Sequence, residues 1–450
     1  MDNKNISKKL NILITAHELS PVLGSECGAA WNIVTRLAKY HNITILYART
    51  NQFGTNNYEA DVSSYIKGNF LENIKFIAID QPRETKFIAS LNKIISHNKS
   101  NVGNPILYFL GVRYWEKSAY RKVKSLILKN DYDILHHLNH ISFREPGYLW
   151  KIDKPFFWGP VSGLVKVPMA FINFWNFGTF IKNIMRNFIG SIQSQFNVRV
   201  SQALKKSRQL YYVSREDACF FDRVTSRGKY LLDVGTYSSN DEITYKAPGN
   251  KFKILWVGRL DYLKALNLLI KALEGMPELR NIIELTVVGD GPQEDHYKKM
   301  AKKLNLENIS WVGKVKKSKV LELMIDSDIL VHTSIKEATS AAVLEALSVG
   351  LPIICHDSFG LSYVINNSCG IKIPLISPLV SIKELNKAIC SLVNNPKTLE
   401  QLRHGAKNRS KSLTWDVMAK EISNDYLMAY CVDKDIDIKE CYVANLKVDI

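Results

Sequence analysis

The stretch from Ile329 to Cys355 constrains the fold more than any other part of the sequence. It opens with the apolar run 329–332 and passes through a polar loop into a helical pattern from about Ser340 to Val349. Gly350 provides a helix stop, and a second apolar run, 351–355, follows at once. A strand, a helix and another strand joined by short loops indicate an α/β domain.

The polar residues of this stretch predict a ligand site. Glu337 lies in the loop before the helix, whereas Glu345 lies inside the apolar run AAVLEAL, where a carboxylate needs a partner. Thr339 and Ser340 stand where an N-cap belongs. The free N–H groups of a helix N-terminus bind phosphate, and carboxylates accept hydrogen bonds from hydroxyls. A nucleotide sugar offers both kinds of group.

The same alternation of apolar runs and helical patterns extends along the whole chain. At 450 residues the chain is too long for one core, so we expect two α/β domains with doubly wound parallel sheets. The expected strands are 10–16, 43–48, 74–79, 134–138, 156–158, 210–213, 252–257, 283–288, 309–312, 329–332 and 351–355. The expected divisions are an N-terminal domain (1–232), a linker (233–250), a C-terminal domain (251–413) and a final helix and tail (414–450) that pack back towards the N-terminal domain.

Two features of the first half follow expected strands. The loop HELSPVLGSECG contains Gly24 and Gly28 before a helix expected from about Ala29, which suits a phosphate cradle or only a turn. In WGPVSG, the segment from Gly159 to Ser162 could bring backbone N–H groups close to a ligand, and a plain tight turn explains it equally well.

Three histidines lie at the end of the expected strand 134–138. Strand alternation places His136 and His140 on one face and His137 on the other. A metal site is possible, but no acidic ligand follows closely. We favour one histidine as a general base or as a group that orients the acceptor, because open α/β sheets bind ligands at the carboxyl ends of their strands.

Two cations follow the expected strand 252–257, in the loop GRLDYLK. If this strand shares a parallel sheet with 329–332, Arg259 and Lys264 face the helix that begins near Ser340. Two positive charges and a helix N-terminus would then bind a diphosphate. Either cation taken alone would be read as an exposed loop residue.

The formal charge of +17 is unevenly spread. Residues 81–129 carry ten Lys or Arg against two acids, and residues 164–210 carry seven against none, interleaved with Phe and Trp. Nucleic acid and an anionic membrane are both candidate partners. Aromatic residues beside cations favour the membrane, although these aromatics could instead form domain core. No nucleic-acid-binding motif is visible, so we expect no nucleic-acid partner.

Cysteine usage and hydropathy bear on location. Seven scattered cysteines without a CxxC pair indicate reduced thiols, and the sequence has neither a signal-peptide pattern nor 18 consecutive apolar residues. We expect a cytoplasmic protein that is peripheral on the cytoplasmic face of the inner membrane.

Motifs from both halves together resemble a known family. VGRLDYLKALNLLIKAL, VVGDGP, WVGKV, SIKEATSAAVLEALSVGLPII and DSFGLSYVI, in this order, resemble the retaining glycosyltransferases of family 4, which have the GT-B fold of two Rossmann-like domains around a cleft. PVLGSECGAAWN, DILHHLNHISFREPG and WGPVSG resemble the N-terminal half of bacterial members that build surface polysaccharides. The resemblance implies transfer from a nucleoside-diphosphate sugar to a glycan or lipid-linked saccharide, with no metal or other cofactor.

The resemblance also implies roles for single residues. Arg259 and Lys264 would bind the diphosphate, Glu337 the sugar hydroxyls and Glu345 the ribose, with His140 facing the sugar. Further donor contacts are expected from Gly24, Gly258, Gly289, Gly313, Val315, Thr339, Ser340 and Ala341, and acceptor contacts from His136, His137, Gly159 and Ser162. Ala265, Ala338 and Ser340 replace glycines that are usual in the family, so a tighter phosphate loop is expected. Two alternatives remain, a GT-B nucleotide-sugar epimerase and a basic nucleic-acid-binding protein.

Overall fold

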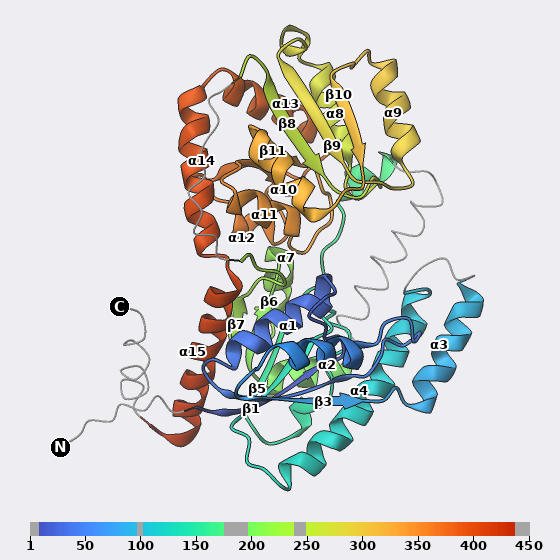
Figure 1. Cartoon of the computed structure of the whole chain (residues 1–450), viewed down its shortest axis with the longest axis vertical. Helices are drawn as coiled ribbons and strands as arrows, with labels where there is room; N and C mark the ends of the chain where they lie inside the picture. The colour runs from blue at the N-terminus through green and yellow to red at the C-terminus, as the bar shows by residue number, and fades with distance from the viewer. Residues whose placement is uncertain (1–8, 97–101, 175–196, 238–248, 437–450) are drawn as a thin grey trace, which may run out of the picture.

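The computed structural model describes residues 9–96, 102–174, 197–237 and 249–436. These residues form two α/β domains, which lie one above the other in Figure 1. Each domain is built on one parallel sheet with helices on both faces. The expected pair of doubly wound, Rossmann-like domains is therefore confirmed.

The N-terminal sheet has the strand order β3-β2-β1-β4-β5-β6-β7. Its strands are β1 (Asn11–Ala16), β2 (Asn42–Ala48), β3 (Ile74–Ile79), β4 (Ile134–Asn139), β5 (Phe156–Val161), β6 (Ser207–Tyr212) and β7 (Gly228–Tyr230). Ile12 and Ile14 of β1 enter one apolar core and Leu13 enters another, on the opposite face of the sheet. Burial on both faces explains why these strands read as continuous apolar runs.

The C-terminal sheet has the corresponding order β10-β9-β8-β11-β12-β13. Its strands are β8 (Phe252–Val257), β9 (Ile283–Val288), β10 (Ile309–Gly313), β11 (Ile329–His332), β12 (Ile353–His356) and β13 (Gly370–Ile373). In both sheets the strand order reverses once, between β1 and β4 and between β8 and β11. Ligands of open α/β sheets bind at such switch points, where the loops at the carboxyl ends of the strands diverge.

The helices connect these strands. In the N-terminal half they are α1 (Ser25–Leu37), α2 (Tyr58–Gly68), α3 (Arg83–Ile95), α4 (Pro105–Ile127), α6 (Val198–Lys206) and α7 (Arg215–Phe221). In the C-terminal half they are α8 (Leu266–Glu274), α9 (Glu294–Lys303), α10 (Lys317–Asp326), α11 (Ala341–Ser348), α12 (Leu361–Val364), α13 (Pro378–Val393), α14 (Pro396–Lys411) and α15 (Trp415–Lys434). Among the described residues, no helix is both long enough and apolar enough to cross a bilayer.

The last helix, α15, returns to the N-terminal domain and lies along it in Figure 1. At the crossing, Thr236 N–H donates to the Leu413 carbonyl at 3.0 Å and Trp415 N–H donates to the Thr236 carbonyl at 3.0 Å. Asp416 then pairs with Arg36 of α1 at 3.1 Å. The chain therefore passes between the domains twice, through two segments that are hydrogen-bonded to each other.

Other contacts also join the domains. The ring of Tyr230 in β7 stacks on Tyr363 of α12, with centroids 4.6 Å apart and planes at 14°. Ser358 Oγ, from the loop after β12, donates to Glu216 of α7 at 3.1 Å. The two sheets thus present their loops to each other.

Three details of the structure differ from the expectations drawn from the sequence, and a fourth concerns the basic aromatic stretch 164–210. Helix α1 begins at Ser25, so Gly28 lies inside a helix and not in the loop before it. The short strands β7 and β13 were not expected. Cys431 is disulfide-bonded, so the expectation of reduced thiols throughout is wrong. Phe171 is buried in the apolar core of the C-terminal domain, while residues 175–196 of the basic aromatic stretch lie outside the described residues.

Candidate active site

The C-terminal half of the candidate site forms at the switch point between β8 and β11. Lys264, in the loop after β8, forms an ion pair with Glu337, in the loop after β11. His332, the last residue of β11, lies with Nε2 3.6 Å from the Glu337 carboxylate, and Ser334 Oγ lies 3.3 Å from it. The parallel sheet therefore brings together two residues that are 73 positions apart in the sequence.

Charged neighbours control the ionisation of Glu337. Burial by itself would raise the pKa of this carboxyl, but the nearby imidazole of His332 and the charge of Lys264 outweigh burial and lower the pKa to about 2. Glu337 is consequently an anion at neutral pH, able to accept hydrogen bonds from hydroxyl groups. The neighbouring ammonium of Lys264 suits a phosphate oxygen.

Helix α11 starts directly after this pair. Ser340 is its N-cap residue and makes no side-chain cap hydrogen bond, so that capping position is left for another acceptor. Thr339 and Ser340 are buried, and Ala341 opens the helix. The N-terminus of α11 thus adds partial positive charge beside Lys264.

Glu345 and Arg259 follow the two strands that flank the switch point, β11 and β8. The Glu345 carboxylate, in the middle of α11, pairs with Lys317 Nζ of α10 at 2.7 Å, which supplies the partner that its apolar helix requires. Arg259 follows β8 with 69% of its side chain exposed, and its Nε lies 3.7 Å from Asp261. Arg259 is therefore free to turn towards a ligand.

Glycines lie at the carboxyl ends of the neighbouring strands β8, β9 and β10. Gly258 N–H donates to Val288 at 3.0 Å, and Gly289 N–H donates to Gly313 at 2.9 Å. Gly289 has φ +131°, and a Cβ there would lie 1.9 Å from the Gly258 carbonyl oxygen. These glycines keep the carboxyl edge of β8, β9 and β10 clear of side chains, while Val315 packs against the apolar core.

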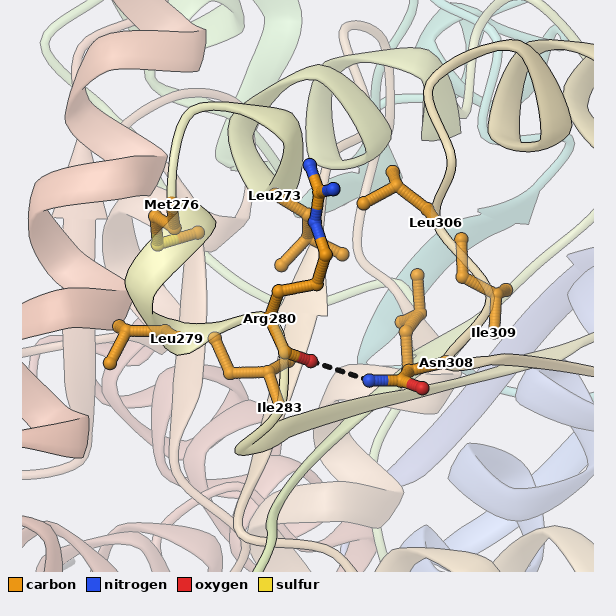
Figure 2. A pocket seen from close by; sticks show the side chains of 9 residues that line it. Leu273, Met276, Leu279, Arg280, Ile283, Leu306, Asn308 and Ile309 are labelled. Carbon is orange, nitrogen blue, oxygen red and sulfur yellow. Dashed lines mark hydrogen bonds between the residues drawn. The ribbon is translucent and has the colours of Figure 1, made fainter.

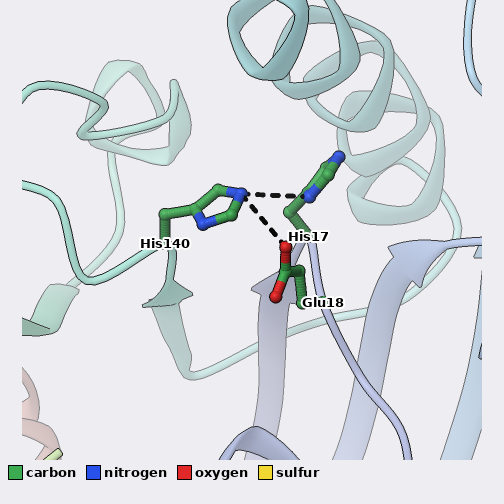
Figure 3. A group of neighbouring side chains, drawn as sticks. All are labelled: His17, Glu18 and His140. Carbon is green, nitrogen blue, oxygen red and sulfur yellow. Dashed lines mark hydrogen bonds and ion pairs between the residues drawn. The ribbon is translucent and has the colours of Figure 1, made fainter. Parts of the chain in front are cut away.

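The N-terminal half of the site forms at the switch point between β1 and β4. His17 and Glu18 follow β1, and His140 follows β4 (Figure 3). His140 Nε2 lies 3.1 Å from His17 Nδ1 and 4.0 Å from Glu18. On its other side, His140 Nδ1 lies 3.1 Å from the Glu26 carboxylate of α1.

This arrangement makes His140 a cation. Burial would lower its pKa, but the Glu26 carboxylate and, after it, Glu18 raise the pKa to about 9. Nδ1–H then donates to Glu26 and Nε2–H donates to His17, whose own pKa is lowered by burial.

The same three residues could in principle share a metal ion. One ligand atom each from His17, Glu18 and His140 lie within 4.8 Å of one another. An ion there would have to displace the proton that His140 Nε2 donates to His17, whereas the Glu26 and Glu18 carboxylates favour the ring with both protons in place. The acidic neighbour, Glu18, follows β1 and therefore lies far upstream of the histidines in the sequence.

The other two histidines of the motif are part of the fold. His136 bonds to Tyr426 of α15 and, at 2.8 Å, to the Gly159 carbonyl. His137 bonds to Thr15 at 3.0 Å and to the Glu145 carbonyl at 3.1 Å. Both rings are fully buried and burial lowers their pKa values, so neither has a free nitrogen for an acceptor. His136 and His140 also lie in different surroundings, because β4 ends at Asn139.

The remaining expected N-terminal residues are placed as follows. Gly159 has φ +123° and precedes a cis proline, and Ser162 is buried with its N–H donating to Ile141 at 2.6 Å. Gly159 thus lies within β5 and Ser162 directly after it, and both residues help to shape the backbone at this strand end. Gly24 is the exposed N-cap of α1, and a Cβ there would meet no atom within 4 Å.

Asp233 connects the two halves. Burial raises its pKa to about 7, and Glu337 of one domain and Glu26 of the other add to the rise while Thr339 opposes it. Residues of both switch points are therefore close to Asp233, which indicates that they face each other across the domain boundary. Five residues of the site were not predicted from the sequence: His17, Glu18, Glu26, His332 and Asp233. His17 and Glu18 could have been predicted, because an imidazole and a carboxylate come directly after the apolar run of β1.

A cavity lies at the opposite edge of the C-terminal sheet (Figure 2). Its lining is apolar apart from Arg280 and Asn308, and it includes Ile283 and Ile309, the first residues of β9 and β10. The amino ends of the strands are remote from the switch point, so this cavity is not part of the site.

Comparisons with known proteins agree with this architecture. Residues 239–409 match the family model described as "Glycosyl transferases group 1". An uncharacterized glycosyltransferase of Methanocaldococcus jannaschii is 28% identical over 51% of this chain and 57% of its own length. Protein CapJ of Staphylococcus aureus is 26% identical over 63% of this chain and 71% of its own. The match thus spans little more than half the length of the first relative.

Solved structures show the same fold. Sucrose-phosphate synthase from Thermosynechococcus elongatus superposes with a TM-score of 0.60 over 94% of this chain and 100% of its own, at 15% identity. Anabaena HepE in complex with UDP superposes with a TM-score of 0.54 over 92% and 98%, at 14% identity. The expected GT-B fold and the resemblance to glycosyltransferases are both confirmed.

Proposed function

We propose that this chain, whose residues 239–409 match the group 1 glycosyltransferases, transfers a sugar from a nucleoside diphosphate to a hydroxyl group. The observation that carries the proposal is the meeting of two switch points, one with Lys264, Glu337 and the α11 N-terminus, the other with the His140 network. A diphosphate, a sugar and an acceptor hydroxyl need these groups.

The donor occupies the C-terminal half of the site. Lys264, Arg259 and the N-terminus of α11 bind the diphosphate and stabilise the negative charge that develops on it as the sugar departs. Glu337, anionic at neutral pH, accepts hydrogen bonds from the sugar hydroxyls. Glu345 leaves Lys317 to accept hydrogen bonds from the ribose. Three positive groups make a metal ion unnecessary for charge neutralisation.

His140 orients the sugar and the acceptor in this scheme. An imidazolium with protons on both nitrogens donates hydrogen bonds but cannot accept a proton. We therefore assign His140 to hydrogen bonding and electrostatic stabilisation, not to general base catalysis. Retention of the anomeric configuration follows from the resemblance to family 4, and NMR of the product reports it directly.

The acceptor that we propose is a glycan or lipid-linked saccharide of surface polysaccharide synthesis. The resemblance of the N-terminal motifs to bacterial family members that build surface polysaccharides supports this choice. The excess of positive charge in residues 81–129 supports work at an anionic membrane surface. In this proposal the protein is peripheral on the cytoplasmic face of the membrane.

Nucleotide binding tests the donor assignment. A thermal-shift screen of nucleoside diphosphates should show a stabilising ligand, because binding to the native state raises the melting temperature. Glu345→Gln should weaken the binding of that ligand about tenfold, which corresponds to a loss of roughly 1.4 kcal/mol of binding free energy. Lys317→Gln, which breaks the same ion pair from its other side, should not weaken it. Equal affinity in Glu345→Gln and wild type would overturn the ribose assignment.

Product analysis tests the reaction. The protein should transfer sugar to an acceptor and remain active with excess EDTA. Loss of activity that Mn²⁺ restores would refute metal independence. Isomerised free sugar from donor alone would point to an epimerase instead.

A further inference from the structure

A polar cavity of about 250 Å³ lies at the carboxyl edge of the N-terminal sheet. It is bounded by the loop after β2, by Gln81 after β3 and by one face of α3. Its volume is below that of a typical drug-sized pocket and suits a small polar group. None of the groups assigned above to the donor or to catalysis lines it.

The cavity has an anion-binding lining. Lys86, Ser90 and Lys93 line it from α3 and follow one another at the i, i+4, i+7 spacing of a single helix face. No acidic residue belongs to the lining. Lys93 Nζ donates to the Phe53 carbonyl at 3.2 Å, which holds its ammonium at the cavity. Two ammonium groups and a hydroxyl are suitable partners for a phosphate.

The cavity adjoins the His140 network. Gln81 Nε2 donates to the Thr50 carbonyl at 2.7 Å and lies 3.3 Å from His17 Nε2. His17 in turn lies 3.1 Å from His140. A group bound in the cavity is therefore separated from the network by the single side chain of Gln81.

A second face of α3 is apolar and exposed. Phe87, Leu91 and Ile94 repeat at the same i, i+4, i+7 spacing, one position after the basic row, and are exposed by 71%, 39% and 73%. The buried residues of α3 are others, Thr85, Ile88, Ala89 and Asn92. In Figure 1, α3 lies at the outer side of the N-terminal domain. Exposed apolar groups beside lysines suit the boundary between lipid headgroups and chains.

We propose that the cavity binds a phosphate of a lipid-linked acceptor, with the lipid chain lying over Phe87, Leu91 and Ile94. The basic row of α3 selects the phosphate, and the apolar row of the same helix selects the lipid to which it is esterified. This assignment rests on the proposed glycosyltransferase function and specifies the acceptor of that reaction. It places the acceptor saccharide next to Gln81 and hence next to His140.

Calorimetric titration with three probes tests the assignment: farnesyl phosphate, farnesol and inorganic phosphate. The wild type should bind farnesyl phosphate more tightly than either of the others. The double variant Lys86→Gln/Lys93→Gln should bind farnesyl phosphate at least about tenfold more weakly than the wild type. Lys299→Gln/Lys302→Gln, the same charge change on α9 of the other domain, should not. The double variant Phe87→Ser/Ile94→Ser should bind farnesyl phosphate more weakly and should bind inorganic phosphate with unchanged affinity.

Each other outcome overturns part or all of the proposal. Unchanged binding in the Lys86→Gln/Lys93→Gln variant, or no binding of farnesyl phosphate by the wild type, overturns the phosphate site. Equal binding of inorganic and farnesyl phosphate, with no effect of Phe87→Ser/Ile94→Ser, overturns the lipid part. Nucleoside diphosphate binding, measured on every variant, shows that the fold is intact. Its absence from the wild type would refute the proposed function independently of these results.

Discussion

His140 holds a proton because two carboxylates surround it. Its folded pKa of about 9 lies above the ordinary value of 6.5, so the interaction stabilises the fold fully below pH 6.5 and is lost as the pH rises through 9. The shift corresponds to roughly 3 kcal/mol. The stability advantage of the wild type over His140→Gln should therefore shrink between pH 7.5 and pH 9.5, as measured by urea unfolding.

His356 supplies the control for this measurement. It is as deeply buried, but burial lowers its pKa to about 4, so it is neutral in both the folded and the unfolded chain above pH 7.5. The advantage of the wild type over His356→Gln should be constant from pH 7.5 to pH 9.5. A constant advantage over His140→Gln as well would show that His140 is not an imidazolium.

Single residues were predicted unevenly from the sequence. Lys264 and Glu337 could be paired because each follows an apolar strand of one sheet, and parallel strands bring their carboxyl ends to one edge. His17 and Glu18 also follow a strand, but glycines further along the same loop are the more familiar sign of a phosphate site. Asp233 could not have been found, since only the approach of two domains brings Glu26 and Glu337 near it.

The glycines at the ends of β9 and β10 differ in what they allow. Gly289 and Gly313 both have positive φ, but only at Gly289 would a Cβ meet backbone, 1.9 Å from the Gly258 carbonyl oxygen. Gly313→Ala should cost about 1–2 kcal/mol of unfolding free energy from backbone strain alone. Gly289→Ala should cost about 3 kcal/mol or more, because strand ends must also move apart. Chemical denaturation of both variants checks the order, and equal losses would contradict it.

Helix α15 is attached to the N-terminal domain by buried polar contacts, at Tyr426 and Ser423, and by exposed ones, at Asp416. Tyr426→Phe removes the hydroxyl that bonds His136 and leaves a buried ring nitrogen unpaired, which should cost about 1–3 kcal/mol. Asp416→Asn breaks pairs with Arg36 and Lys39, but the Asp416 side chain is 43% exposed, so the loss should be below about 1 kcal/mol. Thermal unfolding of both variants would reveal the reverse order if the exposed pairs anchored the helix.

Elements with strong patterns were predictable. β3, β8, β9 and β11 begin and end where the apolar runs predict. The start of α1 was not, because glycine disfavours helix interiors, and Gly28 read as loop. Inside α1, Gly28 lies so close to the Leu23 carbonyl oxygen that a Cβ would be 2.5 Å from it. β7 is only three residues long and its pattern was too short to recognise.

At the scale of the whole molecule, the N-terminal domain needs α15 to shield its apolar core from water. The buried residues of α15 include Trp415, Met418, Ile422, Tyr426 and Leu427, which belong to the same apolar core as residues of α1. A chain that ends at Leu413 should therefore expose this core, bind the dye ANS and unfold at a lower temperature than the full chain. A truncated chain with unchanged melting temperature would contradict this prediction.

The double crossing at Thr236 and Trp415 also governs how such a chain can be recombined. A hybrid made by one junction near residue 250 would combine the N-terminal domain of one parent with the α15 of the other, and the mismatched helix would have to fit a foreign α1. Two junctions, one near residue 250 and one at Leu413, keep the N-terminal domain together with its own α15. If the proposed function holds, donor specificity should accordingly be transferable as an internal segment, whereas simple exchange of chain halves should yield poorly folded hybrids.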